Sequence, residues 1–333
     1  IAIGSAGRNS NSRVTNCVIH DIGTPDRKNV SFGTFGLNVG PVEGLEIDNC
    51  NIYNIKNGDA NSRAIGIFTW GNNDTDTVAN VNIHDNTIED VGNPGNSVYG
   101  ISTGFYGKDI TVSNNTIKNV KSGIRIQSFM QGPVSVTGNT VENASVSGIR
   151  LDGEQTQTVT GNTISGCATG VLITETCGET AAQISGNTFE ENAVHVQDDR
   201  STASANYLEE LLANNTFPEG SQVIGNQIKV PTWADLADTS WYNDPSATSF
   251  TINTAEQLAG LAKLVNSGTS FNGKTICLGE DIDLENIEWI PIGSYYGTWF
   301  GGVFNGNGHK IRGIKITDNT LPEVGLFGYV RGS

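Results

Sequence analysis

The stretch Val134-Ser-Val-Thr-Gly-Asn139-Thr-Val141 decides the fold, because its pattern, apolar-x-apolar-x-x-Asn-Thr-apolar, recurs along much of the chain. Close copies start at Val81, Ile110, Gln157 and Ala182. Recurrence of one short pattern at a spacing of a few dozen residues is typical of repeat architectures, in which each copy is one structural unit. The repeat is therefore the first feature to interpret.

Three further copies are less regular. Asn16-Cys17 and Asn49-Cys50 carry Cys in place of Thr, and Asn226 marks a late copy. Successive Asn residues of the series are 33, 37, 29, 24, 23, 25 and 39 positions apart. A constant minimum with a variable excess is expected when coils of fixed length stack on one another and loops are inserted between their strands.

Most copies are followed by a glycine and a run in which apolar and polar residues alternate, as in Gly123-Ile-Arg-Ile126 and Gly148-Ile-Arg-Leu151, and Val194-His-Val196 is the same element without its glycine. Alternation with period two over four to six residues predicts half-buried strands. In stacked coils, equivalent residues lie about 4.8 Å apart, so the Asn of each coil can bond the Asn above and below it. An antiparallel sandwich is the alternative, but hairpins do not require Asn at one fixed position.

The repeat resembles the right-handed parallel β-helix repeat family over roughly residues 1–230. The resemblance implies an all-β fold, a right-handed parallel β-helix solenoid with an Asn ladder. Apolar residues at helical spacing in 204–212 predict a short amphipathic helix near the last coil, where it could cover exposed core.

A second region follows a predicted linker over 231–249. Thr254-Ala-Glu-Gln257 is a capping box in front of an apolar helical pattern, and strands are expected at 274–278 and 311–316. These features predict a helix-capped second β-solenoid-like region over 250–333. The stretches Trp289-Ile-Pro-Ile-Gly293, Phe304-Asn-Gly-Asn-Gly-His-Lys-Ile311 and Gly325-Leu-Phe-Gly-Tyr-Val330 closely resemble the bacterial cell-surface module built on GLUG repeats. That module usually runs on for more repeats, so we expect this region to be truncated and the chain to belong to a larger multidomain surface protein.

The composition excludes several classes of function. With 19 Lys and Arg against 35 Asp and Glu, the net charge is -16, which argues against nucleic acid and anionic membranes as partners. No apolar run is long enough to span a bilayer, so membrane insertion is not expected. The GLUG resemblance implies a secreted or cell-surface bacterial protein.

Polar positions of neighbouring coils should form rows on the outer wall of the solenoid. Arg125 and Arg150 occupy equivalent places, and Leu172 and His195 are expected to continue their row. Two stacked arginines require a carboxylate or an anionic ligand between them. We expect Asp152 or Glu154 to supply the carboxylate, either in a plain surface ladder or in a cleft that binds an acidic sugar.

A second row beside the arginines contains Gln127, Asp152, Thr174 and Gln197. Glycoside hydrolysis needs two carboxylates that flank one bond, and Asp152 with Glu154 or Glu175 could provide them. On this hypothesis Asp152, Arg150 and Arg125 are catalytic, and Gln127 and Glu154 bind substrate. The linked Asp residues and Gly-His-Gly of polygalacturonases are absent, and so is a calcium-rich lyase cluster.

Aromatic residues mark the other candidate surface. Trp70, Phe105 and Tyr106 follow neighbouring Gly-Ile strands in coils with long insertions, where binding loops gather. Their rings suit sugar stacking, although loop packing explains them equally well. Asp74 and Asp76 could bind calcium or form a turn, and the turn is favoured.

The remaining chemistry-bearing residues give weaker signals. No spacing typical of zinc ligands occurs, and the four histidines are scattered, so we expect no metal site and no cofactor apart from the calcium option. Cys17 and Cys50 hold equivalent positions in consecutive repeats, where they could form a disulfide or simply be two small residues that replace Thr. The pairing of Cys167 with Cys177 is open in the same way.

Three functions remain open at this point. The first is a glycan-active enzyme, a glycoside hydrolase or polysaccharide lyase that holds a polysaccharide or host glycan along the wall of the β-helix. The second is a non-catalytic adhesin or glycan-binding stalk, and the third is a structural spacer. A glycan array combined with a reducing-sugar assay separates the three.

Overall fold

The computed structural model describes residues 2–3, 10–26, 32–95, 97–178, 181–201 and 205–332. The chain divides into two compact units, Ile1–Val230 and Pro231–Ser333. Each unit has its own hydrophobic core.

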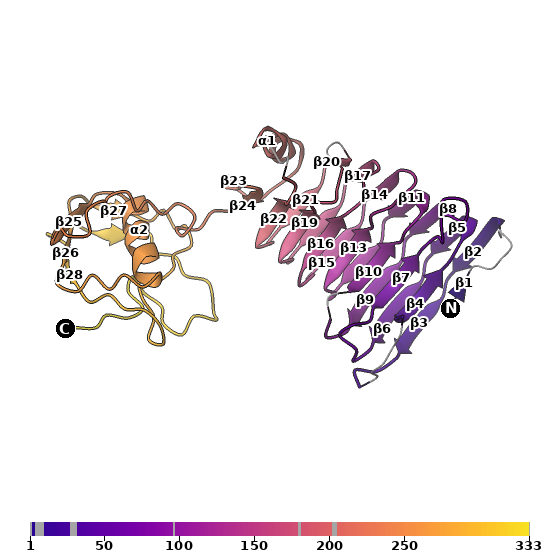
Figure 1. Ribbon diagram of the computed structural model, residues 1–333, viewed down its shortest axis with the longest axis horizontal. Helices are drawn as coiled ribbons and strands as arrows, with labels where there is room; N and C mark the ends of the chain where they lie inside the picture. The colour runs from indigo at the N-terminus through magenta and orange to yellow at the C-terminus, as the bar shows by residue number, and fades with distance from the viewer. Residues whose placement is uncertain are drawn as a thin grey trace. The chain divides into compact units, whose positions relative to one another are not determined.

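The first unit consists of three long sheets whose neighbouring strands lie side by side (Figure 1). The first sheet contains, in spatial order, β1 (Ala2–Ile3), β4 (Thr34–Val39), β7 (Ala64–Thr69), β10 (Val98–Thr103), β13 (Ser122–Ile126), β16 (Ser147–Leu151), β19 (Thr169–Ile173), β22 (Val194–Asp198), β24 (Gln227–Lys229) and β23 (Gln222–Ile224). The second contains β2 (Ser10–Thr15), β5 (Val42–Asp48), β8 (Val78–His84), β11 (Gly107–Ser113), β14 (Val134–Thr137), β17 (Gln157–Thr160) and β20 (Ala182–Ser185). The third contains β3 (Val18–Ile22), β6 (Asn51–Lys56), β9 (Thr87–Gly92), β12 (Thr116–Lys118), β15 (Thr140–Glu142), β18 (Thr163–Ser165) and β21 (Thr188–Glu190).

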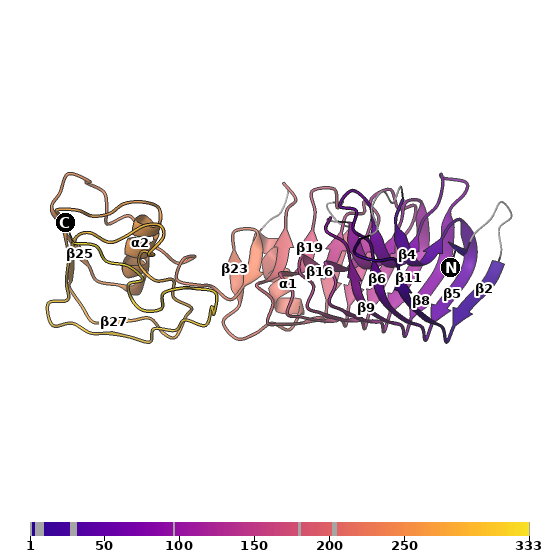
Figure 2. The same cartoon turned by 90° about the horizontal axis from the view of Figure 1, so that it is seen from below.

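The chain visits the three sheets in turn, and each strand from β1 to β22 pairs in parallel with its equivalent one coil away. Figure 2 shows this stack of coils from below. The predicted right-handed parallel β-helix is therefore confirmed.

The interior of the β-helix is apolar because alternate residues of every strand point inward. Ile117, Val141 and Ile164 of the third sheet have no exposed surface. The glycines of the Gly-apolar runs face these side chains across a narrow interior: a Cβ added at Gly100 would lie 2.5 Å from the side chain of Ile117. Glycine thus recurs there because a side chain would collide with the opposite wall.

The bend between the second and third sheets carries the predicted Asn ladder. Asn115 Nδ2 donates to Asn139 Oδ1 at 3.0 Å, and Asn139 Nδ2 donates to Asn162 Oδ1 at 2.9 Å. Each carboxamide also bonds backbone groups, as when Asn139 Nδ2 donates to Val112 O at 2.9 Å. These side chains satisfy backbone groups that the bend would otherwise leave buried and unpaired.

The two ends of the ladder differ from the sequence prediction. The register pairs Asn51 with Thr87, so Cys50 and not Asn49 occupies the position of Asn86. The Cys residues therefore replace Asn and not Thr. At the other end, the ladder continues from Asn187 to Asn215, whose Oδ1 accepts from Asn187 Nδ2 at 2.9 Å.

The last coil is closed by elements of another kind. The predicted helix is present as α1 (Ala205–Asn214), and Ser204 lies outside the described residues. Leu208 and Leu211 of this helix are buried in the core of the first unit. The late repeat copy around Asn226 is not a coil, because β24 pairs antiparallel with β22 and β23.

The second unit contains the parallel strands β25 (Ser249–Ile252), β26 (Thr275–Leu278) and β28 (Val303–Asn305), the pair β27 (Ile282–Asp283) and β29 (Ile311–Arg312), and the helix α2 (Ala255–Asn266). Thr254 caps α2 by accepting from Gln257 N. The structure differs from the predicted linker over 231–249, because Trp233 is buried in the core of this unit and donates to Leu284 O at 3.0 Å.

Candidate functional site

The outer face of the second sheet carries a polar cluster on its first three strands. Arg13 of β2, Glu46 of β5 and Asn82 of β8 form one outward row, because the strands pair in register. Asp48 and His84 lie in the next outward row. The later coils carry only small hydroxyl residues at the positions equivalent to Asp48: Ser113, Thr137, Thr160 and Ser185.

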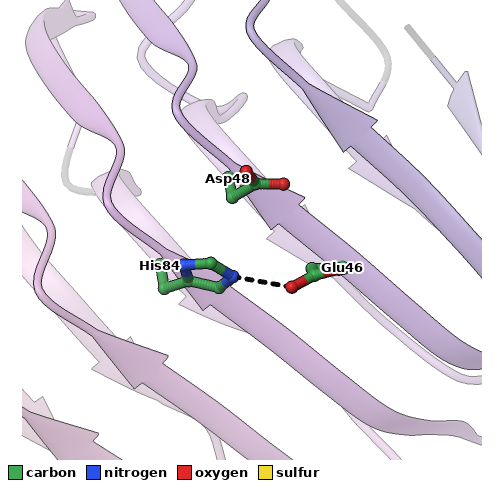
Figure 3. Close-up of side chains that lie close together, drawn as sticks. All are labelled: Glu46, Asp48 and His84. Atoms are coloured by element: carbon green, nitrogen blue, oxygen red, sulfur yellow. Dashed lines mark hydrogen bonds and ion pairs between the residues drawn. The ribbon is translucent and has the colours of Figure 1, made fainter.

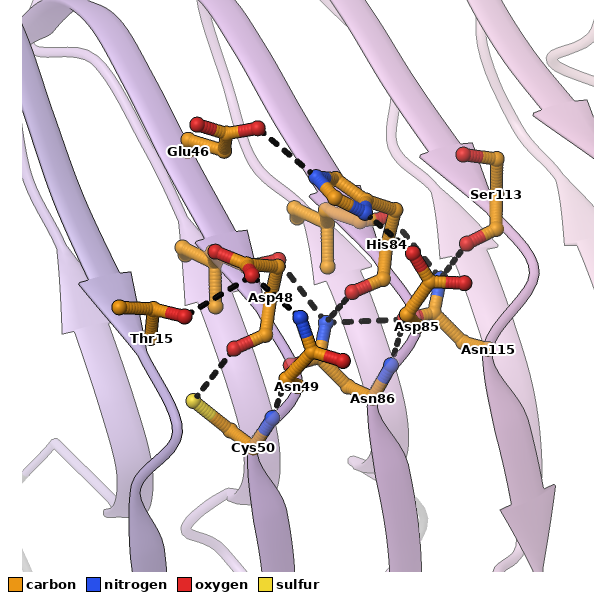
Figure 4. Close-up of polar contacts among 12 residues, drawn as sticks. Thr15, Glu46, Asp48, Asn49, Cys50, His84, Asp85, Asn86, Ser113 and Asn115 are labelled. Atoms are coloured by element: carbon orange, nitrogen blue, oxygen red, sulfur yellow. Dashed lines mark hydrogen bonds and ion pairs between the residues drawn. The ribbon is translucent and has the colours of Figure 1, made fainter.

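Asp48 is the fixed centre of this cluster. Its side chain has no exposed surface, and its two oxygens accept from Arg13 Nε and Nη2, both at 2.8 Å. Oδ2 also accepts from Thr15 Oγ1 at 2.9 Å and from Asn49 Nδ2 at 2.5 Å (Figure 4). The bonds from Arg13 hold the pKa of Asp48 well below its ordinary value. Asp48 is therefore a permanent anion with one oxygen, Oδ1, that accepts only from Arg13 among the described residues.

His84 lies between two carboxylates. Its Nε2 is 3.0 Å from Oε1 of Glu46 (Figure 3). Its Nδ1 is 2.7 Å from Oδ2 of Asp85 (Figure 4). The hydrogen bond with Asp85, supported by that with Glu46, raises the pKa of His84 against the opposing effect of burial. In the neutral ring, a proton held on Nδ1 by Asp85 leaves the lone pair of Nε2 directed at Glu46.

This arrangement fits a bound metal ion. The ligand atoms of Glu46, Asp48 and His84 all lie within 4.8 Å of one another. A metal-binding histidine ordinarily donates its second ring N–H to a carboxylate, as His84 can to Asp85. Imidazole and carboxylate ligands suit Cu²⁺, whereas Cu⁺ prefers sulfur.

A cavity of about 350 Å³ opens beside the cluster. Arg13, Glu46, Asn80 and Asn82 contribute to its wall. The Oδ1 atom of Asn82 is buried and has no hydrogen-bond partner among the described residues. The cavity thus offers an entry route to an ion held by Glu46 and His84.

Sequence reasoning missed this cluster of Glu46, Asp48 and His84. Glu46 and His84 are 38 positions apart, and neither belongs to a spacing typical of metal ligands. The available signal was the register: aligning the apolar residues Ile47 and Ile83 places Asp48 beside His84.

On the first sheet, the structure brings Arg125, Arg150 and Asp152 together. Arg125 Nε donates to Asp152 Oδ2 at 2.6 Å, and Arg150 Nε donates to Oδ1 at 2.9 Å. Thr174 Oγ1 donates to Oδ1 at 2.8 Å. Burial alone would raise the pKa of Asp152, but the charges and hydrogen bonds of the two arginines outweigh it and lower the pKa. A carboxylate held ionised in this way supports the wall electrostatically and does not suit a general acid.

The register corrects one expected row. Leu172 continues the arginine row as predicted, but its next neighbour is Gln197, and His195 points into the core with 1% exposure. The error arose because His195 stands where the other coils have the inward-facing glycine of the Gly-apolar run.

The two substrate-binding residues predicted near the arginines lie in different surroundings. Gln127 is buried and donates to Ser102 Oγ at 2.9 Å. Glu154 is exposed in the loop after β16, and Glu175 is exposed after β19. Their roles toward a substrate stay predictions.

The predicted aromatic residues fall into two groups. Trp70 packs with Phe35 against Ile65, Phe68 and Tyr99 in a cluster on the outer face of the first sheet. Phe105 lies in a loop, where its ring centroid is 6.1 Å from that of Phe129. Tyr106, also in that loop, is half-buried and has a left-handed backbone conformation with φ of 55°.

Arg125 joins the aromatic cluster to the arginine–aspartate group. Its guanidinium carbon lies 5.1 Å from the centre of the Tyr99 ring, and its Nη1 donates to Tyr99 Oη at 3.1 Å. The outer face of the first sheet therefore carries aromatic and charged groups in one strip, in which Phe68 and Tyr99 are buried and Trp70 is half-buried.

Two smaller predictions concern turns and thiols. Asn73 Oδ1 accepts from the N–H groups of Thr75 and Asp76, so this segment forms a tight turn. A calcium ion at Asp74 and Asp76 stays a prediction. All five cysteines are free thiols in this structure.

No curated protein matches this chain. Residues 10–236, more than half of the chain, match the family model described as periplasmic copper-binding protein (NosD), a family of right-handed parallel β-helices. No helix in the described part of the chain is long and apolar enough to cross a membrane. The periplasmic character of the family confirms the predicted secreted or cell-surface localisation. On these findings, the chain belongs to the NosD family of periplasmic β-helix proteins.

Proposed function

We propose that this protein binds a divalent copper ion on the outer face of its first coils, with His84 and Glu46 as ligands and Asp48 as a third oxygen donor. The observation that carries the proposal is the position of His84, whose Nδ1 is engaged by Asp85 while its Nε2 faces Glu46. Copper binding is the property named for the family, and this cluster has a donor set that suits Cu²⁺.

The protein's own residues would prepare the site before an ion arrives. Arg13 and Thr15 fix the carboxylate of Asp48, and Asp85 fixes the orientation of the His84 ring. Glu46 is partly exposed, so its side chain can adjust to the ion. The bound copper would supply a positive charge that offsets the local excess of carboxylates and a centre that can accept one electron.

The test is Cu²⁺ binding measured by isothermal titration calorimetry and electron paramagnetic resonance. We expect one ion per chain, with nitrogen hyperfine coupling from one imidazole. His84→Gln and Glu46→Gln should each weaken binding by at least tenfold. The matched control is His20→Gln, because His20 has the same 2.7 Å contact to a neighbouring Asp21 but lies outside the cluster. Undiminished binding by His84→Gln would refute the proposal.

A second candidate function is glycan binding along the first sheet, by an enzyme or by an adhesin. It is favoured by the aromatic cluster around Trp70 and Phe68, which lies on the outer wall and not in the interior. Phe32, which is about half exposed, lies 6.5 Å from Trp70 between ring centres. Flat apolar rings beside Arg125 suit a sugar that carries a carboxylate.

Glycan binding is tested by an array of polyuronates and host glycans combined with a reducing-sugar assay. Trp70→Ala and Phe32→Ala should reduce retention if the strip binds sugar, whereas Tyr296→Ala, an aromatic residue that is 88% exposed in the second unit, should not. Retention without turnover would favour the adhesin. Equal retention by all variants would remove the strip from glycan binding.

The assignment of the second unit to GLUG-like surface modules is also a proposal. Its parallel strands β25, β26 and β28 stack in register behind a capped helix, as a short solenoid would. The family match ends at residue 236 and leaves residues 237–333, most of this unit, outside it.

A further inference from the structure

The second compact unit contains two adjoining hollows, neither of which belongs to the copper site or to the aromatic strip. The first has a volume of about 290 Å³ and lies against the C-terminal part of α2. The second has a volume of about 220 Å³. Asn266 and Ile290 contribute to the walls of both, so the two hollows together form one elongated groove within this unit.

Helix α2 makes room for the first hollow with small residues. Ala259 and Ala262 are three positions apart, so they lie one above the other on one face of the helix. Both alanines are buried and line the hollow, whereas the helix buries large apolar side chains at Leu258, Leu261 and Val265. A longer side chain at either alanine would therefore fill the hollow.

Two tryptophans give the first hollow an apolar wall. Trp233 and Trp289 both line it and are 4% and 1% exposed. Their N–H groups are engaged inside the unit, since Trp233 Nε1 donates to Leu284 O at 3.0 Å and Trp289 Nε1 donates to Leu326 O at 3.3 Å. The two rings therefore offer carbon atoms, and not a donor, to a molecule in the hollow.

The two hollows carry charges of opposite sign. Of the described residues in the two walls, only Lys263 is charged in the first hollow and only Glu323 in the second. Lys263 is exposed in the last turn of α2, and Glu323 is half-buried. Neither side chain forms an ion pair within the described part of the chain. Each charge is therefore available to a ligand, and the groove is positive at one end and negative at the other.

This pattern fits a small ligand that has an apolar body between a carboxylate and an ammonium group. At about 30 Å³ for each water molecule, the hollows correspond to about ten and about seven waters, which is room for roughly one amino acid residue in each. Exposed charge pairs contribute little affinity, so the apolar wall would supply most of the binding and the charges would set its direction. A single amino acid carries both charges on one carbon and cannot place them in two hollows.

We propose that the second unit binds a short linear peptide of two or three apolar residues with free ends. Its terminal carboxylate lies beside Lys263, and its terminal ammonium lies beside Glu323. The last side chain of the peptide fills the first hollow against Trp233 and Trp289. This site is independent of the copper and glycan sites, which lie in the first unit.

The experiment is calorimetric titration of the full chain, at low ionic strength, with dileucine and trileucine. Each peptide is used free, acetylated, amidated and blocked at both ends. The wild type should bind a free peptide and lose about fivefold in affinity with either block. Lys263→Gln should lose about fivefold for the free peptide and nothing more on amidation, because the partner of the carboxylate is already gone. Glu323→Gln should behave in the same way toward acetylation.

The matched controls are Lys310→Gln and Glu280→Gln, which remove exposed charges of the same unit outside both hollows. Both should keep the wild-type affinity and its response to each block. Ala262→Leu fills the first hollow and should weaken binding by at least about tenfold. The comparison of Lys263→Gln with amidation decides the matter even if urea unfolding shows that Ala262→Leu is not folded.

Three results would overturn the proposal. One is the absence of binding of both free peptides by the wild type. Another is a loss on amidation that is the same in the wild type and in Lys263→Gln, since the carboxylate would then lie elsewhere. The third is equal affinity for the free and the doubly blocked peptides, which would leave a plain apolar groove without recognition of the peptide ends.

Discussion

The first coils and the later coils of the β-helix build the same bend with different residues. In the later coils, the inner position is Asn and the outer position before it is Ser or Thr, as in Asn139 with Thr137. In the first two coils, the inner position is Cys17 or Cys50, and Asp48 is the outer residue before Cys50. The third coil has Asn86 at the inner position and His84 at the outer position before it. The difference shows that the inner column needs side chains that bond the backbone of the bend, whereas the residues of the outer wall vary. Departures from the repeat gather in the first coils.

The largest effect is expected from removing a ladder residue in the later coils. Asn139 accepts from the N–H and the carboxamide of Asn115 and donates to Val112 O. Asn139→Ala leaves several buried groups unpaired at about 1–3 kcal/mol each, so we expect a loss of about 4 kcal/mol in the free energy of unfolding, measured with denaturant.

The control for this variant lies at the same bend in the neighbouring coil. Asn114 has φ of 53° just before the ladder residue, and the later coils have glycine there, as at Gly138. Asn114→Gly should change the free energy of unfolding by well under 1 kcal/mol. A loss at position 139 no larger than this would mean that the ladder does not hold the bend.

A somewhat smaller loss is expected from the wall of the first sheet. Asp152 is 3% exposed and bridges Arg125 and Arg150, which are partly exposed. Breaking a fully buried ion pair costs about 3–5 kcal/mol, and partial exposure of the arginines reduces this cost. Asp152→Asn should therefore lower the free energy of unfolding by about 3 kcal/mol. Glu142→Gln breaks the partly exposed ion pair with Lys118 and should lower the free energy of unfolding by less than about 1 kcal/mol.

This variant also separates a structural from a catalytic Asp152. The lowered pKa of Asp152 means that its contribution is present above pH 3.8 and is lost as the pH falls below it. A variant that keeps wild-type stability but loses glycan turnover would favour catalysis. A variant that is destabilised and has unchanged retention of glycans would favour a purely structural bridge.

The sequence was sufficient for the fold because the repeat is written in local patterns. Alternating apolar residues set the strands, and Asn139 and its equivalents mark one bend in every coil. The same patterns located Arg125 and Arg150, each two residues after a glycine, and Asp152, four residues after one. What spacing alone could not supply was the register at the irregular coils.

Two errors in the predicted positions show the physical reason why spacing alone did not give the register. Asn49 looked like a ladder residue, but the apolar residues on either side of the bend place Cys50 in the inner column. His195 looked like an outward residue, but it takes the inward place of glycine in the last coil, where Phe217 packs against it. The same residue type recurs at a position where every coil has the same neighbours above and below it. The end coils have different neighbours, so their residues depart from the repeat.

The last coil supplies the next prediction. His195 is buried between Phe189 and Phe217, and its ring nitrogens have no hydrogen-bond partner among the described residues. Burial lowers the pKa of His195 to about 4 from 6.5. Protonation therefore favours the unfolded chain, and the stability present above pH 6.5 should fall by about 2 kcal/mol between pH 7 and pH 5.

The matched variant is His195→Leu, which keeps the volume and removes the titrating ring. The other groups titrate in the same way in the wild type and in this variant. The difference between their free energies of unfolding should therefore follow the titration of His195 alone. Urea unfolding at pH 5, 6 and 7 measures the difference. A wild type and a variant with parallel pH profiles would show that His195 is not the group that titrates.

The smallest effect tests the outer wall of the first coils without removing a metal ligand. Asp85 is exposed and its carboxylate contacts Nδ1 of His84, so Asp85→Asn leaves Glu46, Asp48 and Nε2 in place. Loss of a carboxylate that orients a ligating histidine typically weakens metal binding by ten- to hundredfold. We expect the lower end, about tenfold for Cu²⁺, because Asn can still accept a hydrogen bond from the ring.

The control is Asp90→Asn, which alters an exposed aspartate of the same coil with a similar backbone, φ of 54° against 56° at Asp85. Calorimetry should show unchanged Cu²⁺ affinity for this variant and unchanged unfolding for both. A tenfold loss of Cu²⁺ affinity that is confined to Asp85→Asn would establish that Asp85, on the outer wall of the early coils, orients His84. Equal affinity in the two variants would leave His84 as an ordinary surface histidine, and the early coils would then differ from the later ones in composition alone.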